Sequence, residues 1–424
     1  MSLLSQSEQD RQNKMKTISL LFVFQLWAGG GLEVDCQGSL VMIGGNLRED
    51  NIDIWSRMVN LSSPGEGGVR IGVITAANSE AAYWGEYYVE MFQRFGGQAV
   101  WLEVILEDPS SPYSQENVRI IQSCSGIFLG GGEPWRLALT LMEVSEDGGR
   151  GDTPVLAAIK SVRLRGGMIA ATSAGIEALS DSVIVTGGYS WEALTYGASE
   201  ASNGTDSRNL TYDPLGGLGV INNILVDAHF RARGRYGRLT RLLADTRTSD
   251  LALGVDEDTA LVCEVAQQVE KCEIIGSGGV WLLSLPPSDC GESESVWRCG
   301  EVLTSLLTHN DLITLTPPTW TLHFADWKQE VEEAEGVPET TEDVFGTTFN
   351  DETLQYEYDR VVHSLLTLRT NQTFGLTREK DPRGYKLRFR KVAGPLLETT
   401  GHTEAVKYQH FLSYKNLLVD FTPI

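Results

Sequence analysis

The sequence lacks several features that would assign the chain to a class at once. Its 424 residues hold only 6 cysteines and 6 histidines, and no two cysteines form a C-x-x-C pair, which argues against zinc or thioredoxin chemistry. The chain has 34 Lys and Arg against 57 Asp and Glu, and the resulting net charge of −23 disfavours nucleic acid and anionic membrane surfaces as partners. No apolar run has the length of a typical transmembrane helix, so we expect no stable membrane insertion. No internal repeat is evident.

Residues 1–30 have the pattern of a leader followed by a secretory signal peptide. Lys14 and Lys16 precede an apolar run over residues 18–27, and the small residues that a signal peptidase requires follow at 28–31. We therefore expect a secreted, extracellular protein. Two alternatives are a buried strand and an uncleaved anchor, and Met15 is an alternative start.

The even number of cysteines fits an oxidising compartment. Short loops favour the pairs Cys263–Cys272 and Cys290–Cys299, which leaves Cys36–Cys124. Several buried free thiols are the alternative. Four N-x-[ST] sequons add modest support for secretion and predict glycosylation at Asn60, Asn203, Asn209 and Asn371.

From residue 37 to 318 we expect one α/β domain. Short apolar runs that read as strands alternate with amphipathic stretches of helical spacing. The strands are expected at 39–43, 69–75, 99–105, 126–129 and 167–171, and the helices at 81–95, 117–123 and 135–144. This alternation predicts a mostly parallel sheet flanked by helices on both faces, with glycines clustered just after strands, where such sheets bind ligands.

The composition changes beyond residue 318. Residues 319–352 are rich in acidic side chains and are expected to form a solvated linker, or alternatively an acidic binding tail. Residues 353–424 regain Leu, Val, Phe and Tyr, and they are expected to form a C-terminal extension or a small appended domain.

Ser173 follows the predicted strand 167–171 in the run Thr172-Ser-Ala-Gly175. A strand that passes through a tight turn of small residues into a helix lifts the central side chain out of the sheet and directs backbone N–H groups at the same point. The run is not G-x-S-x-G, since Ala171 replaces the first glycine. The alternative is that Thr172 or Ser173 only caps the next helix.

His229 is the only histidine before residue 309, and it belongs to a segment over 227–238 that also holds four arginines. The segment follows an apolar run, which places His229 at the end of a strand. Arginine binds carboxylates in a bidentate manner, so this cluster beside a base indicates a substrate that carries carboxylates. An isolated structural histidine is the alternative.

Three consecutive acids, Asp256, Glu257 and Asp258, follow the apolar run 251–255. An acid at the end of a strand can orient an imidazole and stabilise its protonated form. A turn with solvated acids is the alternative.

Together these runs, with Leu129-Gly-Gly-Gly132 upstream, resemble those of the cyanophycinase and aspartyl dipeptidase family over residues 38–265. The resemblance implies a flavodoxin-like or class-I glutamine amidotransferase-like sheet and a serine-type peptidase without metal or cofactor. It implies Ser173 as nucleophile, His229 as general acid and base, and Glu257 as the orienting acid. It also implies an oxyanion hole and a substrate-binding set. The oxyanion hole would be formed by Gly131, Gly132 and Ala174, and the substrate-binding set by Asp227, Arg233, Arg235 and Arg238.

The family's enzymes release β-aspartyl-arginine dipeptides from cyanophycin or cleave aspartyl dipeptides, so the resemblance implies a small peptide with an aspartyl or isoaspartyl bond as substrate. Two departures, Ala228 and Pro134, replace glutamines of the family pattern and argue against cyanophycin itself. Two other readings stay open, an α-aspartyl dipeptidase and a catalytically silent secreted binding or matrix protein. A homodimer is compatible with the sequence.

Overall fold

The structure is a computed structural model. It describes residues 38–63, 69–144, 149–202, 206–266, 269–285, 290–293, 296–316, 319–350, 353–392, 403–408 and 411–424. The expected signal peptide, Cys36 and the sequon at Asn203 lie outside these residues. Among the described helices, none combines the length and the hydrophobicity needed to cross a membrane.

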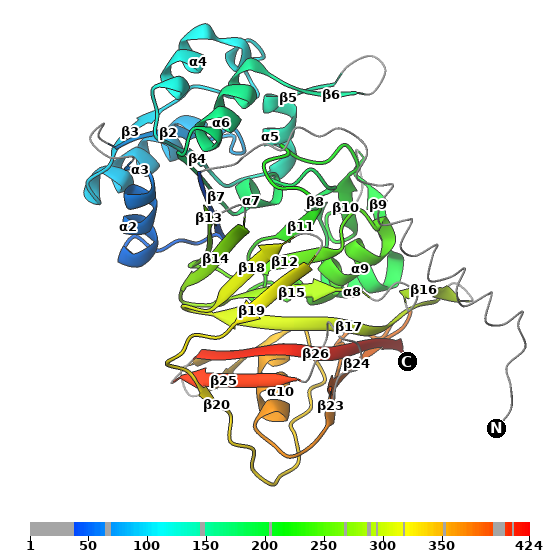
Figure 1. The fold of residues 1–424 in the computed structure, drawn as a ribbon. Helices are drawn as coiled ribbons and strands as arrows, with labels where there is room; N and C mark the ends of the chain where they lie inside the picture. Colours follow the sequence, from blue (N-terminus) through cyan, green and yellow to red (C-terminus); the bar gives the residue numbers. More distant parts are fainter. Residues whose placement is uncertain are drawn as a thin grey trace, which may run out of the picture. The chain divides into compact units, whose positions relative to one another are not determined.

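The first large sheet is mixed, with nine strands (Figure 1). Their order across the sheet is β19 (Thr319–His323), β18 (Leu312–Thr316), β14 (Val269–Gly276), β13 (Thr259–Ala266), β1 (Ser39–Ile43), β7 (Met168–Thr172), β4 (Gly126–Leu129), β2 (Arg70–Ile74) and β3 (Gln98–Trp101). The five strands from β1 to β3 are parallel, and they correspond to the five strands predicted between residues 39 and 171.

The prediction of a mostly parallel sheet is therefore right for only part of the molecule. The strands β13, β14, β18 and β19 add to β1 in antiparallel fashion. Hairpins account for two of these pairs, β13 with β14 and β18 with β19, because consecutive strands separated by a few residues pair antiparallel without a crossover helix.

Helices cover both faces of the parallel part. On one face α2 (Ile52–Leu61) and α3 (Ala81–Arg94) bury Trp55 and Phe92 against Val41 and Ile43 of β1. On the other face α5 (Pro134–Leu141) and α6 (Pro154–Leu164) pack with Leu40 and Met42. The alternation along β1 is the two-residue period of a strand buried on both sides. The helix α4 (Gln115–Gln122) packs beside α6.

A second large sheet contains ten strands (Figure 1). Its main path is β11 (Ile224–Asp227), β12 (Leu251–Val255), β15 (Gly279–Ser284), β17 (Val296–Thr308), β26 (Phe411–Pro423), β24 (Tyr385–Lys391) and β23 (Gln372–Leu376), and the side strands are β16 (Cys290–Ser293), β25 (Glu404–Tyr408) and β20 (Gln329–Glu330). The helices α8 (Ser190–Tyr196), α9 (Tyr236–Thr246) and α10 (Glu357–Leu366) contribute to the core that covers this sheet.

Three smaller sheets complete the described strands: β8 (Ile184–Gly187), β10 (Leu210–Asp213) and β9 (Ala198–Glu200); β21 (Thr347–Asn350) with β22 (Thr353–Tyr356); and β5 (Met142–Val144) with β6 (Arg150–Asp152).

The C-terminal residues are part of this second sheet, where the sequence predicts an extension or an appended domain. The strand β26 lies between β17 and β24 and pairs with both. Tyr414 and Val419 of β26 share one buried core with Trp281 of β15 and Val361 of α10. The acidic stretch 319–352 also joins the sheets, since β19 pairs with β18, and β20 pairs with β25.

Two of the predicted disulfides are formed, Cys263–Cys272 between β13 and β14 and Cys290–Cys299 between β16 and β17. Cys124 is buried and forms no disulfide with another described cysteine. Its predicted partner Cys36 lies outside the described residues, so the pair Cys36–Cys124 stays a prediction.

Candidate active site

The three predicted chemical segments meet at the end of β1. The carbonyls of Ile43, Gly44 and Gly45 accept hydrogen bonds from the backbone N–H groups of Ser173, His229 and Asp258, at N···O distances of 2.9, 2.8 and 2.9 Å. Since β7, β11 and β12 all end beside this point, the backbone at the end of β1 is hydrogen-bonded to three segments that are far apart in the sequence. This edge, at the carboxyl ends of parallel strands, is where open α/β sheets place ligands.

Ser173 occupies a sharp turn between β7 and the short helix α7 (Ala174–Glu177). Its backbone has φ 54° and ψ −125°, a sparsely populated conformation for a residue with a side chain. Although Ser173 is the N-cap residue of α7, its side chain makes no capping hydrogen bond. The alternative that Ser173 only caps a helix is therefore wrong, and its hydroxyl is free for another partner.

That partner is His229. The Ser173 Oγ lies 2.7 Å from His229 Nε2, and His229 Nδ1 lies 2.7 Å from Glu257 Oε1. A carboxylate can only accept hydrogen bonds, so Nδ1 carries the ring proton and Nε2 is left as the acceptor for the serine hydroxyl. The structure thus brings together the three residues predicted as nucleophile, base and orienting acid.

The protonation states suit this arrangement. Burial lowers the pKa of His229, helped by the charges of Arg233 and Arg235, and it outweighs the opposing effect of Glu257. The imidazole is therefore neutral at neutral pH. Burial alone would raise the pKa of Glu257, but hydrogen bonds from Asn46 and His229 outweigh burial and hold that pKa below its usual value. Asn46 belongs to no motif of the sequence.

Gly131 lies directly against the serine. A Cβ built on Gly131 would stand 2.9 Å from Ser173 Cβ and 3.4 Å from its Oγ, so only glycine permits this approach. Gly132 has φ 145° and packs against the Ala77 carbonyl, while Ala174 begins α7 and is buried. The predicted oxyanion residues therefore lie on the two segments that flank Ser173.

Tyr88 of α3 also reaches this corner, although no sequence motif includes it. Its phenol interacts with the Gly131 backbone N–H, and burial raises its pKa. Its ring stacks at a tilt against Phe128, with centroids 4.6 Å apart.

Three of the four residues predicted to bind substrate form a buried ion-pair cluster. Asp227 accepts from Arg235 Nη1 at 2.7 Å and from Arg238 Nε and Nη2 at 2.8 and 2.6 Å. Glu177 of α7 also accepts from Arg235, at 2.9 Å. Burial raises the pKa of Glu177, whereas the two guanidinium groups outweigh burial and lower that of Asp227. These arginines are thus engaged by internal carboxylates.

Arg233 differs from its neighbours. Its side chain is exposed and belongs to no ion pair within the described part of the chain. The positive charge of Arg233 lowers the pKa of both His229 and Glu257. Of the predicted arginines, Arg233 is therefore the one whose guanidinium is available to a ligand carboxylate near Ser173. Of the described sequons, Asn60 and Asn371 are exposed and Asn209 is half-buried.

No family model matches the chain. Curated cyanophycinases are similar to it. That of Trichormus variabilis is 33% identical over 215 residues, which cover 50% of this chain and 62% of the relative. That of Geminocystis herdmanii is 29% identical over 244 residues, which cover 57% of this chain and 77% of the relative.

Among solved structures, a peptidase from an acI-B1 Actinobacterium matches with a TM-score of 0.47 and 20% identity, covering 66% of this chain and 97% of that chain. The chain spans less than two thirds of the length of the Trichormus relative. The sequence similarity confirms the resemblance that the motifs indicated, and the chain is cyanophycinase-like.

Proposed function

We propose that the chain is a serine-type peptidase that hydrolyses aspartyl or isoaspartyl peptide bonds. The observation that carries the proposal is the series of hydrogen bonds from Ser173 through His229 to Glu257, each 2.7 Å long. The similarity to cyanophycinases supports the same class of reaction.

The reaction begins when Ser173 Oγ attacks the peptide carbonyl carbon and passes its proton to His229 Nε2. Glu257 stabilises the imidazolium that forms. The backbone N–H groups of Gly132 and Ala174 stabilise the oxyanion, since the Gly131 N–H already interacts with the Tyr88 phenol. His229 then gives the proton to the leaving amine, the C–N bond breaks, and water hydrolyses the acyl-enzyme by the same proton transfers.

Arg233 is the group that we assign to the substrate's free carboxylate, because it is exposed and unpaired among the described residues while its charge reaches the His229–Glu257 pair. A guanidinium binds a carboxylate with two parallel hydrogen bonds. The Asp227–Arg235–Arg238 cluster then has a structural role, because its hydrogen bonds fix the backbone segment that carries His229 and Arg233.

Purified protein incubated with matched α- and β-linked aspartyl dipeptides tests this function. We expect release of aspartate from at least one linkage and none from the Ser173→Ala variant. The preferred linkage separates an isoaspartyl peptidase from an α-aspartyl dipeptidase. Absence of hydrolysis in the whole panel would favour the silent binding protein instead.

We also propose that the chain is secreted. Two disulfides support this, because structural disulfides persist in oxidising compartments. Recovery of the protein from culture medium, with a mass that falls on treatment with an N-glycosidase, is the expected result. Retention inside the cell without glycans would contradict it.

A further inference from the structure

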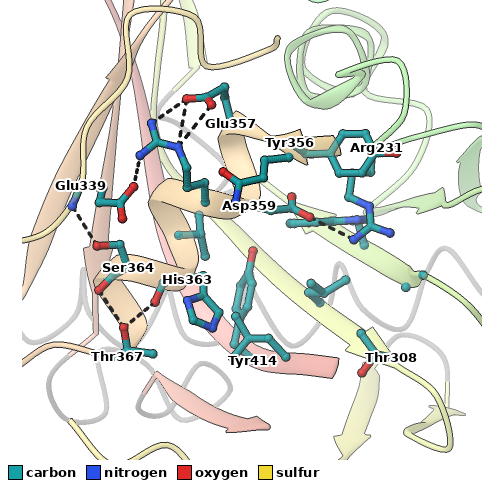
Figure 2. Close-up of a pocket in the computed structure, with 18 of the residues that line it drawn as sticks. Arg231, Thr308, Glu339, Tyr356, Glu357, Asp359, His363, Ser364, Thr367 and Tyr414 are labelled. Carbon is teal, nitrogen blue, oxygen red and sulfur yellow. Dashed lines mark hydrogen bonds and ion pairs between the residues drawn. The ribbon is translucent and has the colours of Figure 1, made fainter. Parts of the chain in front are cut away.

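A cavity of about 1140 Å³ lies between α10 and the second large sheet (Figure 2). Ligand pockets in proteins typically occupy about 300–1,000 Å³, so this space holds a molecule of dipeptide size with water. Its described lining includes none of Ser173, His229 and Glu257. Much of the lining comes from residues 337–368, which lie beyond the motif-bearing part of the chain.

Two buried side chains that line the cavity have polar atoms without a hydrogen-bond partner in the part of the chain that the structure describes. They are the hydroxyl of Tyr414 and the indole Nε1 of Trp281, on residues that are 0% and 1% exposed. Tyr414 Oη is near Thr304, and Trp281 Nε1 is near Asp256, but neither contact has the geometry of a hydrogen bond. Figure 2 shows the Tyr414 hydroxyl directed toward the region of Asp359.

A buried donor without an acceptor costs stability, typically about 1–3 kcal/mol. When such an atom occurs in a native protein, a ligand or a bound water is the expected hydrogen-bond partner. The indole N–H can only donate and the tyrosine hydroxyl can also donate, so a partner with an acceptor such as a carbonyl oxygen satisfies both atoms.

The charges in the cavity favour a cation. Arg231 pairs with Asp256 and Asp359, at 3.4 and 3.2 Å. Arg360 pairs with Glu357 at 2.6 Å and with Glu339. Among the described lining residues, two guanidinium groups thus face three carboxylates, while Asp256 lies outside the lining. Burial lowers the pKa of His363, so its ring adds no positive charge at neutral pH.

Aromatic faces complete this environment. The Arg231 guanidinium already lies 4.8 Å from the ring centroid of Tyr356, and Trp281 and Tyr414 are further aromatic residues of the lining. Aromatic ring faces attract organic cations through the ring quadrupole, and the neighbouring carboxylates add to this attraction. The dominant burial effect and the neighbouring Asp256 raise the pKa of Asp359 to about 6, as expected for a carboxylate whose charge is only partly balanced.

We propose that this cavity is a second binding site, separate from the serine, for a small organic cation that carries an amino or guanidino group and a carbonyl. Asp359 receives the cationic end. Tyr414 and Trp281 donate to the carbonyl end.

Calorimetric titration of the Ser173→Ala protein with L-lysinamide tests the proposal, because this background excludes turnover. Norleucinamide, which keeps the α-ammonium group but lacks the side-chain ammonium group, is the matched probe with one positive charge fewer. We expect saturable binding of lysinamide at one site, at least tenfold stronger than that of norleucinamide. We expect Asp359→Asn to weaken it at least tenfold, and Tyr414→Phe about threefold to tenfold.

Tyr414→Phe keeps the test independent of folding defects, since it removes an unpaired buried hydroxyl and is expected to raise the melting temperature of the free protein. The exposed pair Asp250→Asn and Tyr83→Phe are the matched controls and should bind as the parent does. Absence of saturable binding up to about 10 mM, or equal binding by Tyr414→Phe and the parent, would overturn the proposal. Peptide hydrolysis is measured separately on the unmutated protein, so failure of one proposal is distinguishable from failure of the other.

Discussion

The imidazole of His229 occupies the space that a side chain at Gly45 would need. A Cβ built on Gly45 would lie 2.3 Å from His229 Cε1 and 2.5 Å from Nε2, and the φ of Gly45 is +98°. The Gly45 carbonyl also accepts a hydrogen bond from the Asp258 backbone N–H, at an N···O distance of 2.9 Å. Gly45 thus leaves space for the imidazole of His229, and its carbonyl positions the turn that contains Glu257.

Gly45→Ala should therefore reduce hydrolysis by at least about a hundredfold, because a displacement of the base by 1 Å is enough for a loss of that size. Gly96→Ala is the matched control, since Gly96 has a similar φ of +86° but no heavy atom within 4 Å of its built Cβ. The two variants should lose similar stability, and only the first should lose activity. Equal activities, measured as kcat, would contradict the steric account.

The pH dependence of kcat/KM should show an acid limb with a midpoint below 6.5. The neutral imidazole is the active form, and burial lowers the pKa of His229, so activity rises as pH increases through that lowered value and is complete at pH 7. A midpoint above 6.5 for the unmutated protein would show that the charge of Glu257 dominates over burial.

Glu257→Gln should lower kcat by about 10²–10⁴-fold, because it removes the charge that stabilises the imidazolium and changes the group that orients Nδ1. The carboxylate raises the pKa of His229, so its removal should also move the acid limb to lower pH. Asp258→Asn, in the same turn, is a comparison that leaves the His229 contact in place. A variant that retains full kcat would remove Glu257 from the mechanism.

Arg233→Ala should lower kcat/KM for aspartyl dipeptides by about tenfold to a hundredfold, the value of a hydrogen bond to a charged group. Because the side chain is exposed, the denaturant midpoint should stay unchanged. Loss of the nearby positive charge should raise the pKa of His229 and shift the acid limb upward. Arg298→Ala serves as the comparison, since that arginine of β17 is also exposed.

Asp227→Asn should instead destabilise the fold by about 3–5 kcal/mol, because it leaves two buried guanidinium groups with less compensating charge. Urea unfolding measures the loss, with Asp250→Asn as the exposed control. A change below about 1 kcal/mol, together with weaker substrate binding, would return Asp227 to the role that the family resemblance implies.

The sequence predicts the chemical part of this molecule better than its architecture. Ser173, His229 and Glu257 each follow an apolar strand in a short local motif, so pattern alone identifies them. Asn46, Tyr88 and Glu177 escaped prediction because their roles arise only when remote segments meet. Pattern likewise cannot show that one of several similar arginines, Arg233, is exposed while Arg235 and Arg238 are buried with Asp227.

The same reason explains the errors in the fold. The strands β1, β2, β4 and β7 are short apolar runs bounded by glycine or polar turns, and they are visible in the sequence. The pairing of β17 with β26 joins residues more than a hundred positions apart, for example Val302 with Val419, and no local pattern encodes such a pairing. Residues 319–352 are rich in acidic side chains and lack an apolar run, so the sequence does not indicate the short strands by which this stretch pairs with the two sheets.

The most direct test of an activated serine is covalent labelling by a fluorophosphonate at pH 7.5, with the modified peptide located by mass spectrometry. The account predicts rapid, stoichiometric labelling of Ser173 that is lost in His229→Ala and survives in Arg233→Ala. An unlabelled Ser173 in folded protein, or labelling at the same rate without His229, would contradict it.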